Sequence, residues 1–97
     1  MRSIVYSSES IENLKKIYDH VEKNFSAKKA QETIGVIFEK ISNLKQHPFA
    51  GKTSLISELV RELLVEGNTV YYQVTVETID IVYLKPRGTE LLDYPPK

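Results

Sequence analysis

The spacing of apolar residues changes along this chain, and that change constrains the fold most. Between residues 8 and 46 apolar side chains recur every three or four positions, the period of one face of an α-helix. From residue 59 to residue 84 branched and aromatic residues dominate and partly alternate, which is typical of β-strands. The 97 residues suffice for one domain with a small core. The sequence therefore predicts a single domain, residues 1–97, with helices first and most strands after them.

The helical part divides in two at "NFS", and Ser7 and Ser26 are each predicted to cap the start of a helix. The apolar stripes comprise Ile11, Leu14, Ile17, Tyr18, Val21 and Phe25 in the first helix, and Ala30, Ile34, Ile37, Phe38, Ile41 and Leu44 in the second. So short a link predicts an antiparallel helix hairpin. Because Ile11 belongs to the apolar stripe of the first helix, Ile11→Asp is expected mainly to unfold the protein. Gly35 indicates either close approach of another backbone or a simple weak point in the helix.

The stretch "HPFAGKTS", residues 47–54, contains the Gly-Lys-Thr that ends a phosphate-binding loop. Such a loop needs a second glycine where this chain has Gln46, and it follows a strand rather than a helix. Pro48 cannot continue a helix and Gly51 favours a turn. The stretch is therefore interpreted as a helix stop and surface turn, with Phe49 tucked under the hairpin.

Strands are predicted in "SIVY" (residues 3–6), "LVRELLVEG", "TVYYQVTV" and "TIDIVYL", with turns at residues 66–68 and 77–78. In the middle strand Val70, Tyr72, Val74 and Val76 share the face expected to meet the helices, and Thr69, Tyr71, Gln73 and Thr75 share the other. The order is β-α-α-β-β-β. It predicts an α+β fold with a helix hairpin on one face of a three- to four-stranded antiparallel sheet. Leu91, Leu92 and Tyr94 are expected to dock as a last turn or edge strand.

The formal net charge is zero but is unevenly spread. Residues 1–52 carry nine basic and six acidic side chains, and residues 53–97 carry four and seven. This imbalance gives little support to nucleic-acid binding by the strand half, so no specific DNA binding is expected. The chain has no cysteine, which suits the cytoplasm. No run is apolar enough for a membrane, the two histidines are too scattered for a metal site, and no cofactor is expected.

Three segments, in their order and spacing, resemble the RelE/ParE superfamily of type II toxin–antitoxin toxins, and most closely its ParE-like, plasmid stabilisation branch. They are "YSSESIENLKKIYDHV", "SAKKAQETIGVIFEKISNLKQHPFAGK" and "VRELLVEGNTVYYQV", within a match over about residues 3 to 84. The resemblance implies a cytoplasmic toxin neutralised by a cognate antitoxin. Its ParE-like members inhibit DNA gyrase by protein–protein contact, whereas its RelE-like members are enzymes, endoribonucleases that cut mRNA in the ribosome.

The same resemblance implies candidate site residues. Arg61 matches the arginine of the family's Arg-Glu-Leu strand, Gln73 matches a position held by Gln or Arg, and Lys85 and Arg87 represent the last basic cluster. Thr69 stands where relatives carry an arginine, and losing a positioned cation would cost an RNA-cleaving site roughly 3 kcal/mol. The strand half also lacks a histidine to act as base. Gyrase inhibition is therefore favoured over mRNA cleavage, and a non-toxic binding module is the third hypothesis.

Several candidates have an alternative structural role. Arg61 either contacts a target or pairs within the protein or with the antitoxin, and pairing is favoured. Tyr71 either stacks on a base or packs across strands, and packing is favoured. For Lys85 and Arg87 a target contact and a merely solvated position are evenly balanced. The antitoxin is expected to bind as a helix in a groove beside the hairpin or as a strand added to the sheet edge.

Overall fold

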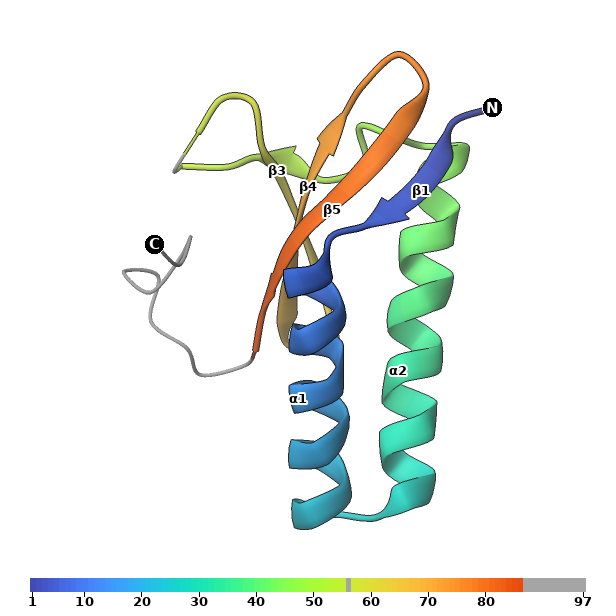
Figure 1. The fold of residues 1–97 in the computed structure, drawn as a ribbon, viewed down its shortest axis with the longest axis vertical. Helices are drawn as coiled ribbons and strands as arrows, with labels where there is room; N and C mark the ends of the chain where they lie inside the picture. Colours follow the sequence, from blue (N-terminus) through green and yellow to red (C-terminus); the bar gives the residue numbers. More distant parts are fainter. Residues whose placement is uncertain (56, 87–97) are drawn as a thin grey trace.

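The computed structural model describes residues 1–55 and 57–86, and Arg87, Leu91, Leu92 and Tyr94 lie outside the described residues. The elements are β1 (Ser3–Tyr6), α1 (Ser8–Asn24), α2 (Ala27–Ser42), a short 3-10 helix η1 (Asn43–Lys45), β2 (Lys52–Thr53), β3 (Arg61–Val65), β4 (Asn68–Val74) and β5 (Thr78–Lys85). The two helices run side by side in opposite directions and pack against the sheet (Figure 1). The α+β class and the helix hairpin are confirmed.

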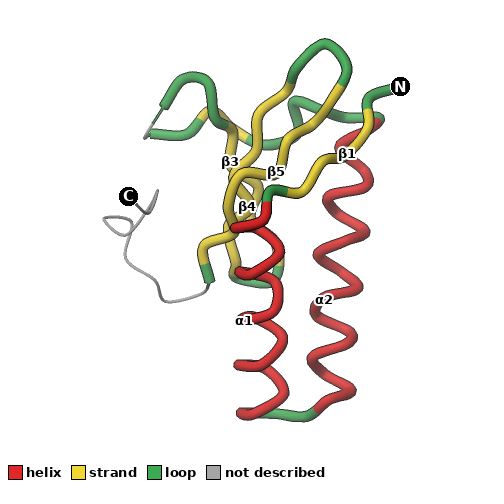
Figure 2. Tube along the Cα trace, viewed as in Figure 1, coloured by secondary structure: helices red, strands yellow, loops and turns green. Residues whose placement is uncertain are grey.

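Both predicted helix caps are present. The Ser7 hydroxyl accepts a hydrogen bond from the Ser10 N–H at 3.0 Å, and the Ser26 hydroxyl accepts one from the Lys29 N–H at 3.0 Å. Each bond satisfies a backbone donor that the first turn of a helix leaves unpaired. Because only Phe25 and Ser26 separate α1 from α2, the second helix must turn back along the first (Figure 2). Neither helix, within the part of the chain that the structure describes, is long and apolar enough to span a bilayer.

Among the described residues five strands form one sheet, in the order β1-β5-β4-β3-β2. Strand β1 runs parallel to β5, with Ser3 opposite Thr78 and Tyr6 opposite Ile81, and every other pair of neighbours is antiparallel. The expected three- to four-stranded antiparallel sheet was therefore wrong in its strand number and in the direction of its first strand. A strand of four residues carries no signal of its neighbour's direction, and β2, with two residues, is too short to alternate.

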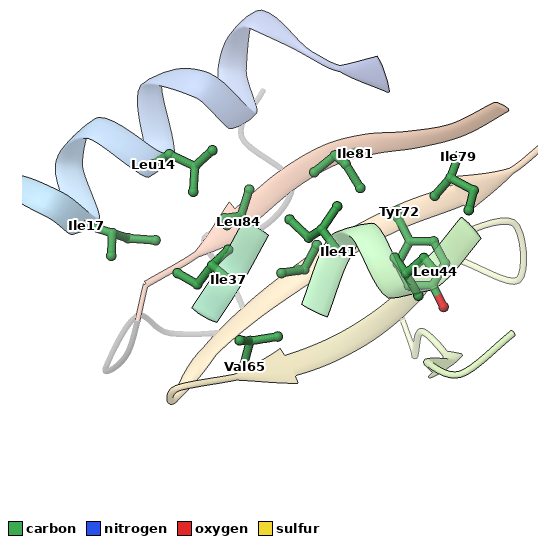
Figure 3. Close-up of a cluster of buried hydrophobic side chains, with 11 residues drawn as sticks. Leu14, Ile17, Ile37, Ile41, Leu44, Val65, Tyr72, Ile79, Ile81 and Leu84 are labelled. Atoms are coloured by element: carbon green, nitrogen blue, oxygen red, sulfur yellow. The ribbon is translucent and has the colours of Figure 1, made fainter. Parts of the chain in front are cut away.

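The core lies between the helix hairpin and the sheet (Figure 3). Its buried residues are Leu14, Ile17, Ile37, Ile41, Leu44, Val65, Val70, Tyr72, Ile79, Ile81 and Leu84. Val70, Tyr72 and Val74 face the helices as predicted, but Val76 is 90% exposed. Strand β4 ends at Val74, and the Thr75 and Thr78 hydroxyls then bond each other at 2.7 Å across the turn, which places Val76 beyond the sheet.

Strand β5 contains an irregularity that lengthens its apolar spacing. Tyr71 pairs with Tyr83 but Tyr72 pairs with Ile81, so Val82 is an extra residue opposite β4. The bulge allows Ile79, Ile81 and Leu84 all to be buried on one face, although their spacing is two and then three. A strictly alternating strand would have turned Leu84 to the opposite face.

Beyond the end of β1, the start of α1 covers the free edge of β5. The Ser7 hydroxyl donates a hydrogen bond to the Val82 carbonyl at 2.8 Å, and the Asn13 side-chain oxygen accepts one from the Leu84 N–H at 3.0 Å. Asn13 is buried, so its carboxamide replaces the strand neighbour that the Leu84 N–H would otherwise need. A sheet edge that would be open is therefore closed by a helix.

Candidate functional site

The sheet face that points away from the helices carries three of the predicted site residues. The strand register places Tyr71 opposite Glu62, Gln73 opposite Asp80 and Thr69 opposite Lys85, and residues opposite each other in antiparallel strands share a face. Tyr71, Gln73 and Lys85 therefore lie on this outer face. It also carries the carboxylates of Glu62 and Asp80, so its charge is mixed rather than basic.

Arg61 lies on the other side of the sheet, opposite Tyr72. Its Nε donates a hydrogen bond to the Gly51 carbonyl at 3.0 Å, and a terminal guanidinium nitrogen makes a longer one, 3.5 Å, to the Phe49 carbonyl. The guanidinium carbon is 5.1 Å from the centre of the Phe49 ring, within the range of a cation–π contact. The structure thus gives Arg61 partners inside the protein, in the turn that follows α2.

Tyr72 holds the same turn from the core. Its hydroxyl accepts a hydrogen bond from the Gly51 N–H at 2.9 Å and donates one to the Pro48 carbonyl at 2.9 Å. A Cβ atom on Gly51 would lie 2.6 Å from the Glu62 carbonyl oxygen and 2.7 Å from the Tyr72 hydroxyl, so a side chain does not fit there. The glycine of the Gly-Lys-Thr sequence is therefore explained by packing against Tyr72, without a nucleotide.

The expectation that Phe49 tucks under the hairpin was wrong. Its side chain is 61% exposed, and its ring contacts Arg61 at the surface. The buried aromatic ring that reaches this turn is that of Tyr72, which belongs to the same core cluster as Leu44. Of the two interpretations of Gly35, close approach of another backbone was wrong, because no atom lies within 4 Å of a Cβ built on it. Within residues 1–55 and 57–86, no other backbone approaches that position.

Tyr71 is covered although it lies on the outer face. Only 1% of it is exposed, because Val60 and Tyr83 pack against it. Burial, and then the negative charge of Glu62 and the neighbouring Tyr83, raise the pKa of the Tyr71 phenol above its ordinary value. Its ring takes part in cross-strand packing, so its faces are not available for a base to stack on.

The helix hairpin has a groove of about 430 Å³, which we call the apolar groove because most of its lining side chains are apolar. It is lined by Tyr6, Ile11, Leu14, Lys15, Tyr18, Ile34 and Phe38. Ile11 and Phe38 are each 44% exposed, and the Tyr6 ring meets the Phe38 ring edge to face at 5.8 Å. Burial raises the pKa of the Tyr6 phenol. The prediction that Ile11 is a core residue was wrong, because the apolar stripe of α1 is wider than the surface that the sheet covers.

A second hollow, which we call the basic groove, has a volume of about 580 Å³ and lies between the hairpin and one end of the sheet. It is lined by Lys16, Ile17, His20, Val21, Phe25, Lys29, Thr33, Glu66, Asn68 and Pro86. Phe25, which the sequence placed on the apolar stripe of the first helix, is 73% exposed. Sequence patterns missed this groove because its walls combine α1, α2 and β4 with residues from the segments that connect or follow the elements.

Comparison with known proteins identifies a family and solved structures that this chain resembles. The chain matches the family model described as ParE toxin of type II toxin-antitoxin system, parDE, over residues 4–90. Its structure is similar to a chain of the chromosomal ParDE TA system from P. aeruginosa, with 25% sequence identity and a TM-score of 0.81, over 91% of this chain and 98% of that one. No curated protein matches the chain. The chain therefore belongs to the ParE toxin family of type II toxin–antitoxin systems.

Proposed function

We propose that this toxin acts by protein–protein inhibition of DNA gyrase and that a cognate antitoxin neutralises it. The observation that carries the proposal is the chemistry of the outer sheet face. Among the residues paired across β2, β3, β4 and β5, the cations on that face are Lys52 and Lys85, and they are matched by the carboxylates of Glu62 and Asp80. Cleavage of RNA requires cations and a general base that converge on one phosphate. A mixed-charge face suits contact with another protein.

The apolar groove supports an antitoxin partner. Its walls come from α1, α2 and β1, and exposed apolar surface of this kind is typical of a binding site for the apolar face of an amphipathic helix. Lys15 at its edge already pairs with Glu12 at 3.3 Å, so the recognition there is mainly apolar. A helix bound in this groove would bury Ile11 and Phe38 together.

Function is tested first by expression. Induction of the chain in bacteria is expected to arrest growth, and co-expression of the protein encoded beside it is expected to relieve the arrest. Purified toxin is expected to inhibit supercoiling by gyrase and to leave mRNA uncut in primer extension. Ribosome-dependent cuts in mRNA without an effect on gyrase would contradict the proposed target, and unimpaired growth would show a binding module without toxicity.

The antitoxin site is tested with Ile11→Asp. Because Ile11 is 44% exposed, the variant is expected to fold, but a carboxylate in the apolar groove should weaken antitoxin binding by at least about thirtyfold, or about 2 kcal/mol. Gln31→Asp adds the same charge at an exposed position of α2 outside the groove, and it should bind like the wild type. Equal affinities of the two variants for the antitoxin, measured by calorimetry, would contradict this site.

A further inference from the structure

The basic groove differs from the apolar groove in its charge. Ile17 and Val21 supply an apolar floor, whereas Lys16 and His20 from α1 and Lys29 from α2 stand around it. Between residues that the structure describes, the one ion pair is Lys15 with Glu12, so neither Lys16 nor Lys29 has a carboxylate partner there. Two unpaired ammonium groups beside an apolar floor favour a ligand that is both acidic and apolar.

The groove owes its shape to the hairpin, whose distal half projects past the end of the sheet (Figure 2). Glu66 and Asn68, on either side of Gly67 in the turn between β3 and β4, close the groove on the sheet side together with Pro86. Among the described lining residues, the cations Lys16 and Lys29 come from the helices, whereas the sheet side contributes Glu66, Asn68 and Pro86. The acidic groups of a ligand should therefore meet the lysines, and its neutral part should lie toward the sheet.

The two grooves need two separate segments of a partner. Ile11, Lys15 and Tyr18 line the apolar groove, whereas Lys16 and His20 line the basic groove. Ile11, Lys15 and Tyr18 are spaced four and three apart and share one face of α1, whereas Lys16 and His20, four apart, share another. Leu14 of the apolar groove and Ile17 of the basic groove are three apart and lie at the boundary between the two faces. One straight helix cannot contact both sides.

We propose that the basic groove binds an acidic amphipathic segment of the antitoxin, distinct from the segment in the apolar groove. The inference rests on the proposed function, because the antitoxin that provides the segment is part of that proposal. Once one segment is bound, the linked second segment is held near its own groove at a high effective concentration. Two linked contacts on one hairpin therefore bind the partner more tightly than either contact alone. Since Pro86 lines the groove and directly follows Lys85, the bound segment would also lie beside the basic end of β5.

The test compares charge reversals inside and outside the groove in the full-length toxin. The groove variant is Lys16→Glu with Lys29→Glu, and the control is Lys23→Glu with Lys28→Glu, which makes the same change on exposed hairpin positions that line neither groove. Affinity for the protein encoded beside the toxin is measured by calorimetry at low and high salt. The groove variant should bind at least about tenfold more weakly at low salt, less so at high salt, and the control should change less than about twofold.

The possible outcomes separate this inference from the proposed function. A wild-type toxin that does not bind the neighbouring protein removes the proposed function itself. If the wild type binds and Ile11→Asp weakens the complex, but the groove variant binds as tightly as its control, only the second segment is overturned. Equal losses in both charge variants also overturn it, since the effect would then be one of overall charge. A wild-type dimer that the groove variant abolishes, with antitoxin affinity unchanged, would assign the groove to a second copy of the chain. Circular dichroism confirms that each variant is folded.

Discussion

At the scale of single residues, Tyr72 connects the core to the turn after α2. Its ring is fully buried, while its hydroxyl bonds both Gly51 and Pro48. Arg61 reaches the same turn from β3 through the Gly51 carbonyl. The turn therefore has a fixed conformation although no helix or strand includes it, because side chains from two strands satisfy its backbone.

Tyr72→Phe keeps the ring and removes both hydrogen bonds of the hydroxyl. We expect the free energy of unfolding to fall by about 1–3 kcal/mol, because the buried Gly51 N–H and the partly buried Pro48 carbonyl lose their partner. Urea denaturation measures the change. Tyr18→Phe, at a groove residue for which the structure shows no hydrogen bond, serves as the control and should stay within about 0.5 kcal/mol of wild type. Equal stabilities of the two variants would contradict the role given to the Tyr72 hydroxyl.

The glycines at 35 and 51 should respond to alanine in opposite directions. Gly51→Ala places a Cβ 2.6 Å from the Glu62 carbonyl, so we expect a loss of about 1–3 kcal/mol in the free energy of unfolding. Gly35→Ala meets open space in the middle of α2, and removing a flexible residue from a helix should add about 0.5–1 kcal/mol. Thermal unfolding of both variants checks the signs, and a stabilising Gly51→Ala would show that the turn can move away from Tyr72.

At the scale of elements, α1 both packs on the core and completes the sheet. Its cap residue Ser7 and its second-turn residue Asn13 bond the edge of β5 where β1 has ended. The bulged residue Val82 itself accepts the hydrogen bond from Ser7, two residues before Leu84. The position of the helix along the strand is therefore set by specific hydrogen bonds as well as by apolar packing.

Asn13→Ala tests this edge. The Leu84 N–H would be left buried without a partner, so we expect a loss of about 1–3 kcal/mol in unfolding free energy and faster amide exchange at Leu84. Asn24→Ala, at the exposed end of α1, is the control and should cost less than about 0.5 kcal/mol. If the Leu84 amide stays as protected as in wild type, the bond to Asn13 does not hold the edge.

Elements with long periodic patterns could be predicted, and short or irregular ones could not. The caps at Ser7 and Ser26 and the helix-facing set of β4 follow from local chemistry and spacing. The direction of β1, the two residues of β2 and the bulge at Val82 depend on contacts between distant parts of the chain, which alternation does not encode.

The candidate site likewise has one part that the sequence predicts and another part that depends on tertiary packing. Alternation along β4 placed Tyr71 and Gln73 together, and the structure agrees. The side of the sheet on which Arg61 lies depends on the register of β3 against β4, which the tight turn at Glu66 and Gly67 sets. The linings of the two grooves depend on how the helices pack against each other. The apolar stripe in the sequence does not reveal them, because it includes more residues than the packed helices finally bury.

At the scale of the whole molecule, two tyrosines link stability to alkaline pH. The pKa values of Tyr6 and Tyr71 are raised from the ordinary value of 10.0, mainly by burial. Above pH 10 the unfolded chain releases phenolic protons that the folded protein still retains, so the free energy of unfolding decreases as the pH rises further. Below pH 10 the two phenols stay protonated in both the folded and the unfolded protein, so they do not make the free energy of unfolding depend on pH.

We therefore expect the wild type to lose stability above pH 10, and the double variant Tyr6→Phe with Tyr71→Phe to lose less over the same range. Urea denaturation at a series of pH values measures both slopes. Each protein is compared with its own stability at neutral pH, which removes the cost of the substitutions themselves. Parallel curves would show that other groups cause the alkaline loss.

The parallel pairing of β1 with β5 also affects how the protein is made. A ribosome produces residues 3–6 early, but their neighbours in the sheet, residues 78–81, are translated only near the far end of this sequence. The helices can form as they emerge, whereas the first strand has to wait. The sheet is therefore completed only after residues 78–81 have left the ribosome, so folding of the whole toxin domain cannot finish while those residues are still being translated.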